Sequence, residues 1–304
     1  MSAPATVTIA EVAPRDGLQN ESVPVPTDLK VAFIDALSEA GFPVIECTSF
    51  VSPRAVPQLA DAELVMQRIQ RRPGTRYLVL VPNERGLDRA LTVGCDAIAL
   101  FAAATDAFSH ANLRASIAET LARYAHVAAQ AKRAGCWIRG YVSVAFHCPY
   151  SGPVAPEQAM RVAQELFAFG CDEIALADTI GTATPADVAR LLEAVLPSIP
   201  KERLSLHLHD TYGRALDNVA VALSYGVTTF DAATGGLGGC PFAPGAPGNL
   251  ATEVLLAFLE ERGIVHGIDR QKLRAAWSRL HEALPGLGQR AGSNRARTAN
   301  PPTT

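Results

Sequence analysis

The sequence predicts a (β/α)8 barrel, the TIM-barrel fold, in which eight parallel strands alternate with helices. A short apolar run, a loop and an amphipathic segment follow one another eight times along the 304-residue chain. The segments GCDAIAL at 94–100 and GCDEIAL at 170–176 repeat one part of this unit. No GxGxxG pattern follows the first expected strand, which argues against a doubly wound dinucleotide-binding sheet.

The expected strands are short and mostly apolar, as is typical of parallel strands that are buried on both faces. We expect them at Val7–Val12, Val44–Phe50, Tyr77–Val81, Ala97–Ala102, Ile138–Ala145, Glu173–Ala177, Leu204–His209 and Thr228–Ala232.

Between the strands, apolar residues recur at helical spacing. The clearest helices are expected at Asp28–Ala40, Ser116–Ala134, Glu157–Phe169, Pro185–Leu196 and Ala215–Tyr225. A glycine falls just after several of these segments, where the left-handed conformation that ends a helix costs glycine nothing. The five glycines with this placement are Gly41, Gly94, Gly135, Gly170 and Gly226.

The predicted catalytic domain covers residues 1–285 and includes an additional C-terminal helix over Asp269–Leu284. From Gly286 onward the helical periodicity disappears, and Gly, Arg, Ser, Thr and Pro dominate. Residues 286–304 are therefore predicted to form a flexible tail.

The composition is that of a soluble globular protein, with 48% hydrophobic and 19% charged residues. A net charge of −3 provides no basic surface for nucleic acid, and no apolar run approaches the ~20 residues that cross a bilayer. The N-terminus lacks the pattern of a signal peptide, and no two of the six cysteines form a CxxC pair. We expect a cytoplasmic protein with reduced thiols and with neither a nucleic-acid nor a membrane partner.

Polar residues gather where the expected strands end, which is where TIM barrels carry out their chemistry. Candidates after or within successive strands are Arg15, Asp16, Glu46, Arg139, Asp178, His207 and His209. A glycine-rich loop, GGLGGCPFAPGAPGN at 235–249, follows the eighth strand and contains Cys240 and Asn249.

His207 and His209 are the sharpest signal among these candidates. Residues i and i+2 of a strand face the same side, so both imidazoles should enter the barrel mouth together. Two hydrogen-bonded histidines in a polar barrel end are the alternative, but with Asp16 expected across the mouth we favour a metal site. Two imidazoles, a carboxylate and the amide oxygen of Asn249 form a nitrogen and oxygen set that suits Mg²⁺, Mn²⁺ or Co²⁺.

Arg15 and Asp16 are adjacent, so both can reach the mouth only if the chain has already left the strand, which Gly17 permits. A surface ion pair is the alternative for these two residues. Glu46 lies among apolar residues and needs a buried partner, for which Arg15 is the natural candidate.

The spacing leaves Asp178 open between a cap for the following helix and a site residue. Cys240 lies on a loop rich enough in glycine to move, where a proton-transferring thiol is more plausible than a structural one.

Together these motifs resemble the hydroxymethylglutaryl-CoA lyase family, within a wider group of metal-dependent barrel lyases and Claisen-type synthases. The resemblance covers about residues 7–285. It rests on EVAPRDGLQNE (11–21), VIECTSFVSPRAVPQLAD (44–61), RGYVS (139–143), DTIGTATP (178–185), LHLHDTYGRALDN (206–218) and GGLGGCPFAPGAPGNLATE (235–253).

The resemblance implies that the metal ligands are Asp16, His207, His209 and Asn249, holding a divalent ion such as Mg²⁺ or Mn²⁺. It implies that Arg15 stabilises an enolate oxygen and that Cys240 transfers a proton. Glu46, Asp178 and Glu253 would support the site, and His207 would also relay a proton.

The implied reaction is retro-Claisen cleavage of 3-hydroxy-3-methylglutaryl-CoA to acetyl-CoA and acetoacetate. The implied partner is therefore an acyl-CoA substrate, and a homodimer is the family expectation. Residues such as Thr234 and Gly235 depart from the family pattern near the mouth, which leaves the acyl group open. The alternatives are a lyase for citramalyl-CoA or isohexenylglutaryl-CoA and, less favoured, a synthase that condenses 2-oxo acids.

Overall fold

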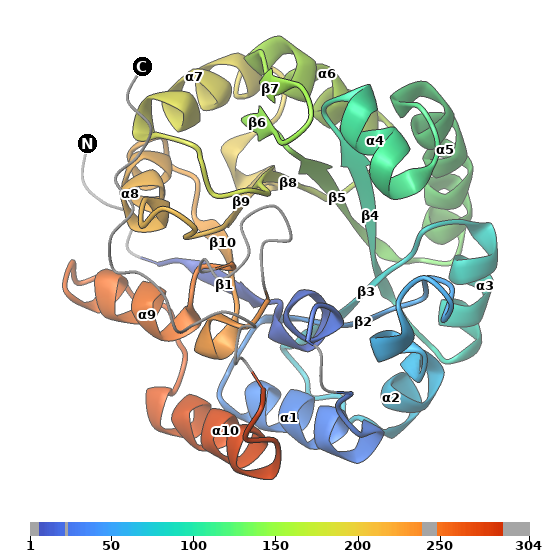
Figure 1. Cartoon of the computed structure of the whole chain (residues 1–304), viewed down its shortest axis with the longest axis vertical. Coiled ribbons are helices and arrows are strands. Elements are labelled where there is room, and N and C mark those ends of the chain that lie inside the picture. Colours follow the sequence, from blue (N-terminus) through green and yellow to red (C-terminus); the bar gives the residue numbers. More distant parts are fainter. Residues whose placement is uncertain (1–5, 22–23, 239–247, 288–304) are drawn as a thin grey trace.

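Eight parallel strands close into a barrel in the computed structural model, which describes residues 6–21, 24–238 and 248–287 (Figure 1). Around the barrel the strands follow the order β1, β10, β9, β8, β5, β4, β3 and β2, and every neighbouring pair is parallel. The predicted (β/α)8 fold is confirmed. None of the described helices is long and apolar enough to cross a membrane.

All eight predicted strands are present, with ends that shift by at most two residues. Their bounds are β1 Thr8–Glu11, β2 Val44–Ser49, β3 Arg76–Leu80, β4 Ala97–Ala103, β5 Trp137–Ser143, β8 Glu173–Asp178, β9 Leu204–Leu208 and β10 Thr229–Ala232. Their outward side chains pack beneath the helices and their inward side chains fill the barrel, so both faces are buried.

Ten α-helices lie in the described part of the chain, and most of them surround the barrel (Figure 1). Their bounds are α1 Thr27–Glu39, α2 Ala62–Arg68, α3 Glu84–Thr92, α4 Asp106–Leu113, α5 Ile117–Arg133, α6 Pro156–Ala168, α7 Pro185–Val195, α8 Ala215–Ser224, α9 Thr252–Glu260 and α10 Arg270–Ala283. Thr184 is the N-cap of α7, and its hydroxyl accepts a hydrogen bond from the backbone N–H of Asp187. The five expected glycines all have positive φ.

The C-terminal helix α10 lies beside α1 on the outside of the barrel (Figure 1). It buries Leu273, Ala276 and Leu280, and the N–H of Asp269, its N-cap, donates to the carbonyl oxygen of Ala40. The predicted tail begins at 286, and its residues 288–304 lie outside the described part of the chain. The boundary between domain and tail stays a prediction.

Small inward-facing residues leave space inside the barrel for larger polar ones. The inner cluster includes Ala10, Ala97, Ala99 and Ala175, and Tyr141 packs among them. Arg139 lies two residues before Tyr141 on β5, faces the same interior, and is fully buried. The sequence places Arg139 at the mouth, and this is wrong: it is the third residue of β5, so its guanidinium lies below the mouth.

Candidate metal centre

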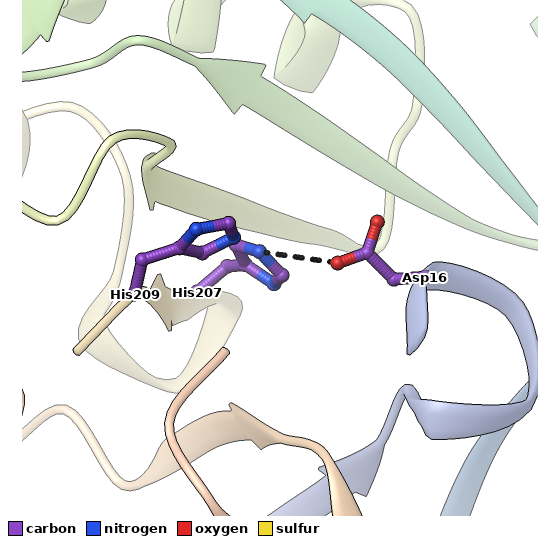
Figure 2. Close-up of side chains that lie close together, drawn as sticks. All are labelled: Asp16, His207 and His209. Atoms are coloured by element: carbon purple, nitrogen blue, oxygen red, sulfur yellow. Dashed lines mark ion pairs between the residues drawn. The ribbon is translucent and has the colours of Figure 1, made fainter. Parts of the chain in front are cut away.

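His207 and His209 extend from β9 into the mouth of the barrel on the same side of the chain. His207 is the fourth residue of β9 and His209 follows its last residue, while Leu208 between them is buried in the core. The two ring centroids are 5.3 Å apart, and each residue is only 7% exposed. Figure 2 shows both rings facing Asp16.

Asp16 reaches the histidines because the chain leaves β1 in a single turn of π-helix, η1, at Ala13–Gly17. This turn brings the carboxylate Oδ2 of Asp16 to 3.9 Å from Nε2 of His207 (Figure 2). A side chain at Gly17 would place a Cβ 2.8 Å from Cβ of Leu237, so this tight approach requires glycine. One ligand atom from each of Asp16, His207 and His209 lies within 4.8 Å of the others.

The charge states of Asp16 and His209 suit a cation, whereas for His207 the contacts with Asp231 and Asp16 outweigh burial and raise the pKa. Burial lowers the pKa of His209 to about 3, with a further contribution from neighbouring His207. Burial opposes ionisation of Asp16, but the charges of Arg15 and the imidazoles outweigh it and lower the pKa to about 2. Nδ1 of His209 is buried with no hydrogen-bond partner among the described residues. A neutral imidazole and an ionised carboxylate are the ligand forms that a divalent metal needs.

Asn249 lies next to this cluster because its backbone forms a β-bridge with His209. Its Nδ2 donates hydrogen bonds to Oδ2 of Asp16 at 2.8 Å and to the carbonyl oxygen of Leu237 at 3.1 Å. Asn249 is thus where a fourth ligand is expected, but its amide nitrogen faces Asp16. Ligation through its oxygen stays a prediction.

Arg15 pairs with two carboxylates through the two arms of its guanidinium. Nη1 lies 2.6 Å from Oδ1 of Asp16, and Nη2 lies 2.6 Å from Oε2 of Glu46. The expected pairing of Arg15 with Glu46 is therefore present, and neither residue is at the surface. Burial raises the pKa of Glu46, although its contact with Arg15 acts in the opposite direction.

Below the histidines lies a polar layer that the sequence did not reveal. Asp231 of β10 contacts His207, Arg139 and Tyr141. The single hydroxyl proton of Tyr141 is within reach of both Asp231, at 3.1 Å, and Glu46, at 3.4 Å. Each of these residues lies in an otherwise apolar strand, and this pattern is what could have indicated the polar layer from the sequence. Their partners could not be assigned without the register between strands.

The ion pairs of the barrel interior carry excess negative charge. The hydroxyl of Tyr141 lies within hydrogen-bond distance of Glu46 and Asp231 and joins these pairs into one network. Its members are the guanidinium groups of Arg15 and Arg139 and the carboxylates of Asp16, Glu46, Glu173 and Asp231. Two positive and four negative groups leave a net charge of −2 when all are ionised. Burial raises the pKa of Glu46, and the contact of His207 with Asp231 raises the pKa of that imidazole, so the net negative charge is at most 2. A divalent cation at the histidines would offset it, and the residues present fit such an ion.

Asp178 ends β8 and is only 1% exposed. Its carboxylate accepts hydrogen bonds from the backbone N–H groups of Thr182 and Ala183, whereas the N-cap of α7 is Thr184. Burial raises the pKa of Asp178 to about 7 against these hydrogen bonds. The residue therefore shapes the loop before α7, and its catalytic role stays a prediction. Cys240 lies outside the described residues.

Glu11, at the end of β1, is a second buried carboxylate that the sequence did not reveal. Its Oε1 accepts hydrogen bonds from the backbone N–H groups of Ala13 and Thr234, and its Oε2 accepts from the hydroxyl groups of Thr234 and Thr252. Glu11 thus connects β1 to the segments on both sides of the glycine-rich loop. Burial raises its pKa to about 7 despite the four hydrogen bonds.

We expect Glu11→Gln to stabilise the protein above pH 7. The folded protein binds the Glu11 proton more tightly than the unfolded chain, so stability falls as pH rises from about 4.5 to about 7. A glutamine keeps the oxygen for the two N–H groups and offers its amide to the two threonine hydroxyls. Urea unfolding of both proteins should give equal stabilities near pH 5 and a variant more stable by up to ~3 kcal/mol near pH 8. A difference that does not change with pH would show that Glu11 ionises normally.

The chain matches the HMGL-like family model over residues 6–280. It is 48% identical over 281 residues to the rat protein named 3-hydroxy-3-methylglutaryl-CoA lyase, cytoplasmic, an alignment that covers 92% of this chain and 82% of the rat protein. The rat hydroxymethylglutaryl-CoA lyase, mitochondrial, is 49% identical over 92% of this chain and 86% of its own length.

Solved structures agree with these relatives. The HMG-CoA lyase of Brucella melitensis superimposes with a TM-score of 0.90 at 49% identity, covering 92% of this chain and 99% of that one. An HMG-CoA lyase of Acinetobacter baumannii, solved with coenzyme A and 3-methylmalate, gives a TM-score of 0.88 at 38% identity over 99% of this chain and all of its own.

Proposed function

Since this chain belongs to the HMGL-like family, we propose that it is a carbon–carbon lyase that cleaves 3-hydroxy-3-methylglutaryl-CoA to acetyl-CoA and acetoacetate. The observation that carries this proposal is the group formed by Asp16, His207 and His209 with Arg15 against it. The group lies at the barrel mouth, in a chain that shares nearly half of its residues with lyases of this name.

Asp16, His207 and His209, with Asn249 as a fourth member, would hold a divalent ion. Their nitrogen and oxygen donors, without a thiolate, favour Mg²⁺ or Mn²⁺. When bound, such an ion supplies Lewis-acid polarisation of the substrate's hydroxyl and carboxylate oxygens and fixes their orientation.

Arg15 is assigned to the charge that develops on the thioester oxygen. In the cleavage, the C3 hydroxyl loses its proton, the C2–C3 bond breaks, and its electron pair becomes an enolate on the acetyl-CoA fragment. Asp16 and Glu46 hold the two arms of the guanidinium, so its orientation is set before substrate arrives. Its Nε is buried and has no hydrogen-bond partner among the described residues, so one N–H of the guanidinium is not engaged by them.

His207 is expected from the resemblance both to bind the ion and to relay the hydroxyl proton. Its Nδ1 is engaged with Asp231 at 3.0 Å, so one remaining nitrogen would have to serve both purposes. This contact supports the ligand role. The relay role stays a prediction, and a proton leaving through His207 would have to pass toward Asp231.

Cys240→Ser tests the remaining proton transfer, in which the thiol would protonate the enolate carbon to give acetyl-CoA. Positioned proton donors typically contribute ~100- to 10,000-fold in rate, so we expect turnover to fall by ~100-fold or more while metal binding is unchanged. Steady-state assays and Mn²⁺ titration measure the two quantities. Full turnover in this variant would remove Cys240 from the mechanism.

The substrate is tested by measuring acetyl-CoA release from a small panel. It would contain 3-hydroxy-3-methylglutaryl-CoA, citramalyl-CoA and an isohexenylglutaryl-CoA, with Mn²⁺ supplied. We expect the highest kcat/KM on the first. A preference for either of the others would keep the retro-Claisen chemistry and correct the acyl group. Condensation of a 2-oxo acid with acetyl-CoA, without cleavage of any panel member, would overturn the proposal.

A further inference from the structure

Asp231 contacts His207 from inside the barrel, on the side opposite Asp16. Its Oδ2 lies 3.0 Å from Nδ1 of His207, whereas Nε2 of the same ring faces Asp16. Asp231 is the third residue of β10 and is 2% exposed. The parallel register pairs it directly with His207 on the neighbouring strand β9, so the backbone sets this contact.

The contact determines which nitrogen of His207 carries the proton. An ionised carboxylate can only accept hydrogen bonds, so Nδ1 must be the donor and the neutral ring must leave Nε2 unprotonated. The unprotonated nitrogen is the one that can bind a metal. It is also the nitrogen that faces Asp16, the other candidate ligand.

Arg139 pairs with Asp231 and holds it in place. Its Nη2 lies 2.7 Å from Oδ1 of Asp231, and its Nε lies 2.7 Å from Oε1 of Glu173. Its other contacts are hydrogen bonds from Nη2 to the hydroxyl of Ser205 and from Nη1 to that of Tyr141. Tyr141 in turn donates to Oδ2 of Asp231 at 3.1 Å. A fully buried guanidinium with these contacts has little freedom to move.

We propose that Asp231 is a positioning residue of the metal centre: it fixes His207 as the Nδ1–H tautomer, and Arg139 holds Asp231 in place. The inference rests on the metal site of the proposed function, but not on the identity of the acyl-CoA. Partners of this kind orient metal-binding histidines in general, and their loss typically weakens metal binding or activity ~10- to 100-fold.

Asp231→Asn is a sharp test because the two ends of an amide differ. The guanidinium of Arg139 repels an NH₂ group, so the amide oxygen should face Arg139 and the NH₂ should face Nδ1 of His207. Nδ1 would then have to accept, and the proton would move to Nε2. We expect the Kd for Mn²⁺, measured by calorimetry without substrate, to rise ~10- to 100-fold.

Glu11→Gln is the matched control. It makes the same change from carboxylate to amide at another fully buried residue that contacts none of the candidate ligands, so Mn²⁺ affinity should be unchanged. Both variants are compared at pH 8, where Glu11 is mostly ionised, so each removes a buried charge. An equal loss of affinity in both would show a general effect of removing buried charge and would overturn the proposal.

The tautomer can also be read in the wild-type protein, which keeps the test independent of whether Asp231→Asn folds. Nitrogen-15 NMR of histidine-labelled, metal-free protein near pH 9 distinguishes the two forms, and His207→Gln identifies the signal. We expect the proton of His207 on Nδ1. A proton on Nε2, or wild-type Mn²⁺ affinity in folded Asp231→Asn, would contradict the proposal. Failure to cleave any acyl-CoA would contradict the proposed function, but it would not affect the conclusion that Asp231 sets the tautomer of His207.

Discussion

Asp16→Ala abolishes metal binding and turnover together if Asp16 is a ligand. The variant loses the only carboxylate among the four candidate ligands, and we expect His207, His209 and Asn249 alone to bind the ion too weakly to retain it. Losing the ion removes several kcal/mol of charge stabilisation in the transition state, so we expect kcat/KM to fall at least ~1,000-fold, or ~4 kcal/mol. Mn²⁺ titration and the acetyl-CoA release assay, run on the same preparation, measure both effects.

Asp28→Ala is the control for this change. Asp28 lies at the start of α1, and its exposed carboxylate pairs with Arg68 at the surface, where an ion pair contributes little. This variant should keep both metal and turnover. A folded Asp16→Ala protein that still binds Mn²⁺ with wild-type affinity would remove Asp16 from the ligand set.

Arg15→Met should lower turnover by ~1,000-fold or more while Mn²⁺ binding persists. Removing a single oxyanion donor typically costs ~100- to 1,000-fold, and here a complete cation is lost. The turnover of Arg15→Lys should lie between those of the wild type and Arg15→Met. An ammonium keeps the positive charge but cannot bind Asp16 and Glu46 through two separate arms. The effect should appear in kcat more than in KM, because the enolate charge that Arg15 stabilises has not yet formed in the bound substrate.

The methionine variant also leaves Glu46 buried without a cationic partner, and an uncompensated buried charge costs ~3–5 kcal/mol. Arg15→Met combined with Glu46→Gln removes that charge, so the double variant should recover stability but not turnover. Recovery of turnover in the double variant, or normal kcat in Arg15→Met, would show that Arg15 is structural.

The fold could be predicted from the sequence because the patterns that indicate its strands and helices are local. Strands such as Val44–Ser49 are apolar runs, and Thr184-Pro185 and the glycines after helices mark where elements begin and end. The hairpin of β6 (His147–Cys148) and β7 (Gly152–Pro153) was not expected. It is too short for a periodic pattern, and its pairing depends on a loop conformation.

The cluster of Asp16, His207 and His209 could also be predicted from the sequence. The i, i+2 spacing of His207 and His209 set a common face, and Gly17 indicated that the chain turns after the first strand. These inferences need only the geometry of one strand or one turn, and the cluster with Asp16 confirms that the three residues come together.

The polar layer below the histidines could not be predicted. Arg139, Tyr141 and Asp231 lie on β5 and β10, which are not adjacent in the barrel. Their contacts depend on the register of the strands between them and on small residues such as Ala175 that leave room. An arginine on an apolar strand could therefore be recognised as unusual, but not placed at the correct depth.

The measurement that tests the central claim most directly is pulsed electron paramagnetic resonance of the Mn²⁺-loaded protein. Bound manganese should show nitrogen couplings from two imidazoles, His207 and His209, and His209→Gln should reduce them to one. Manganese that binds without nitrogen coupling, or couplings that His209→Gln leaves unchanged, would show that these histidines do not hold the ion.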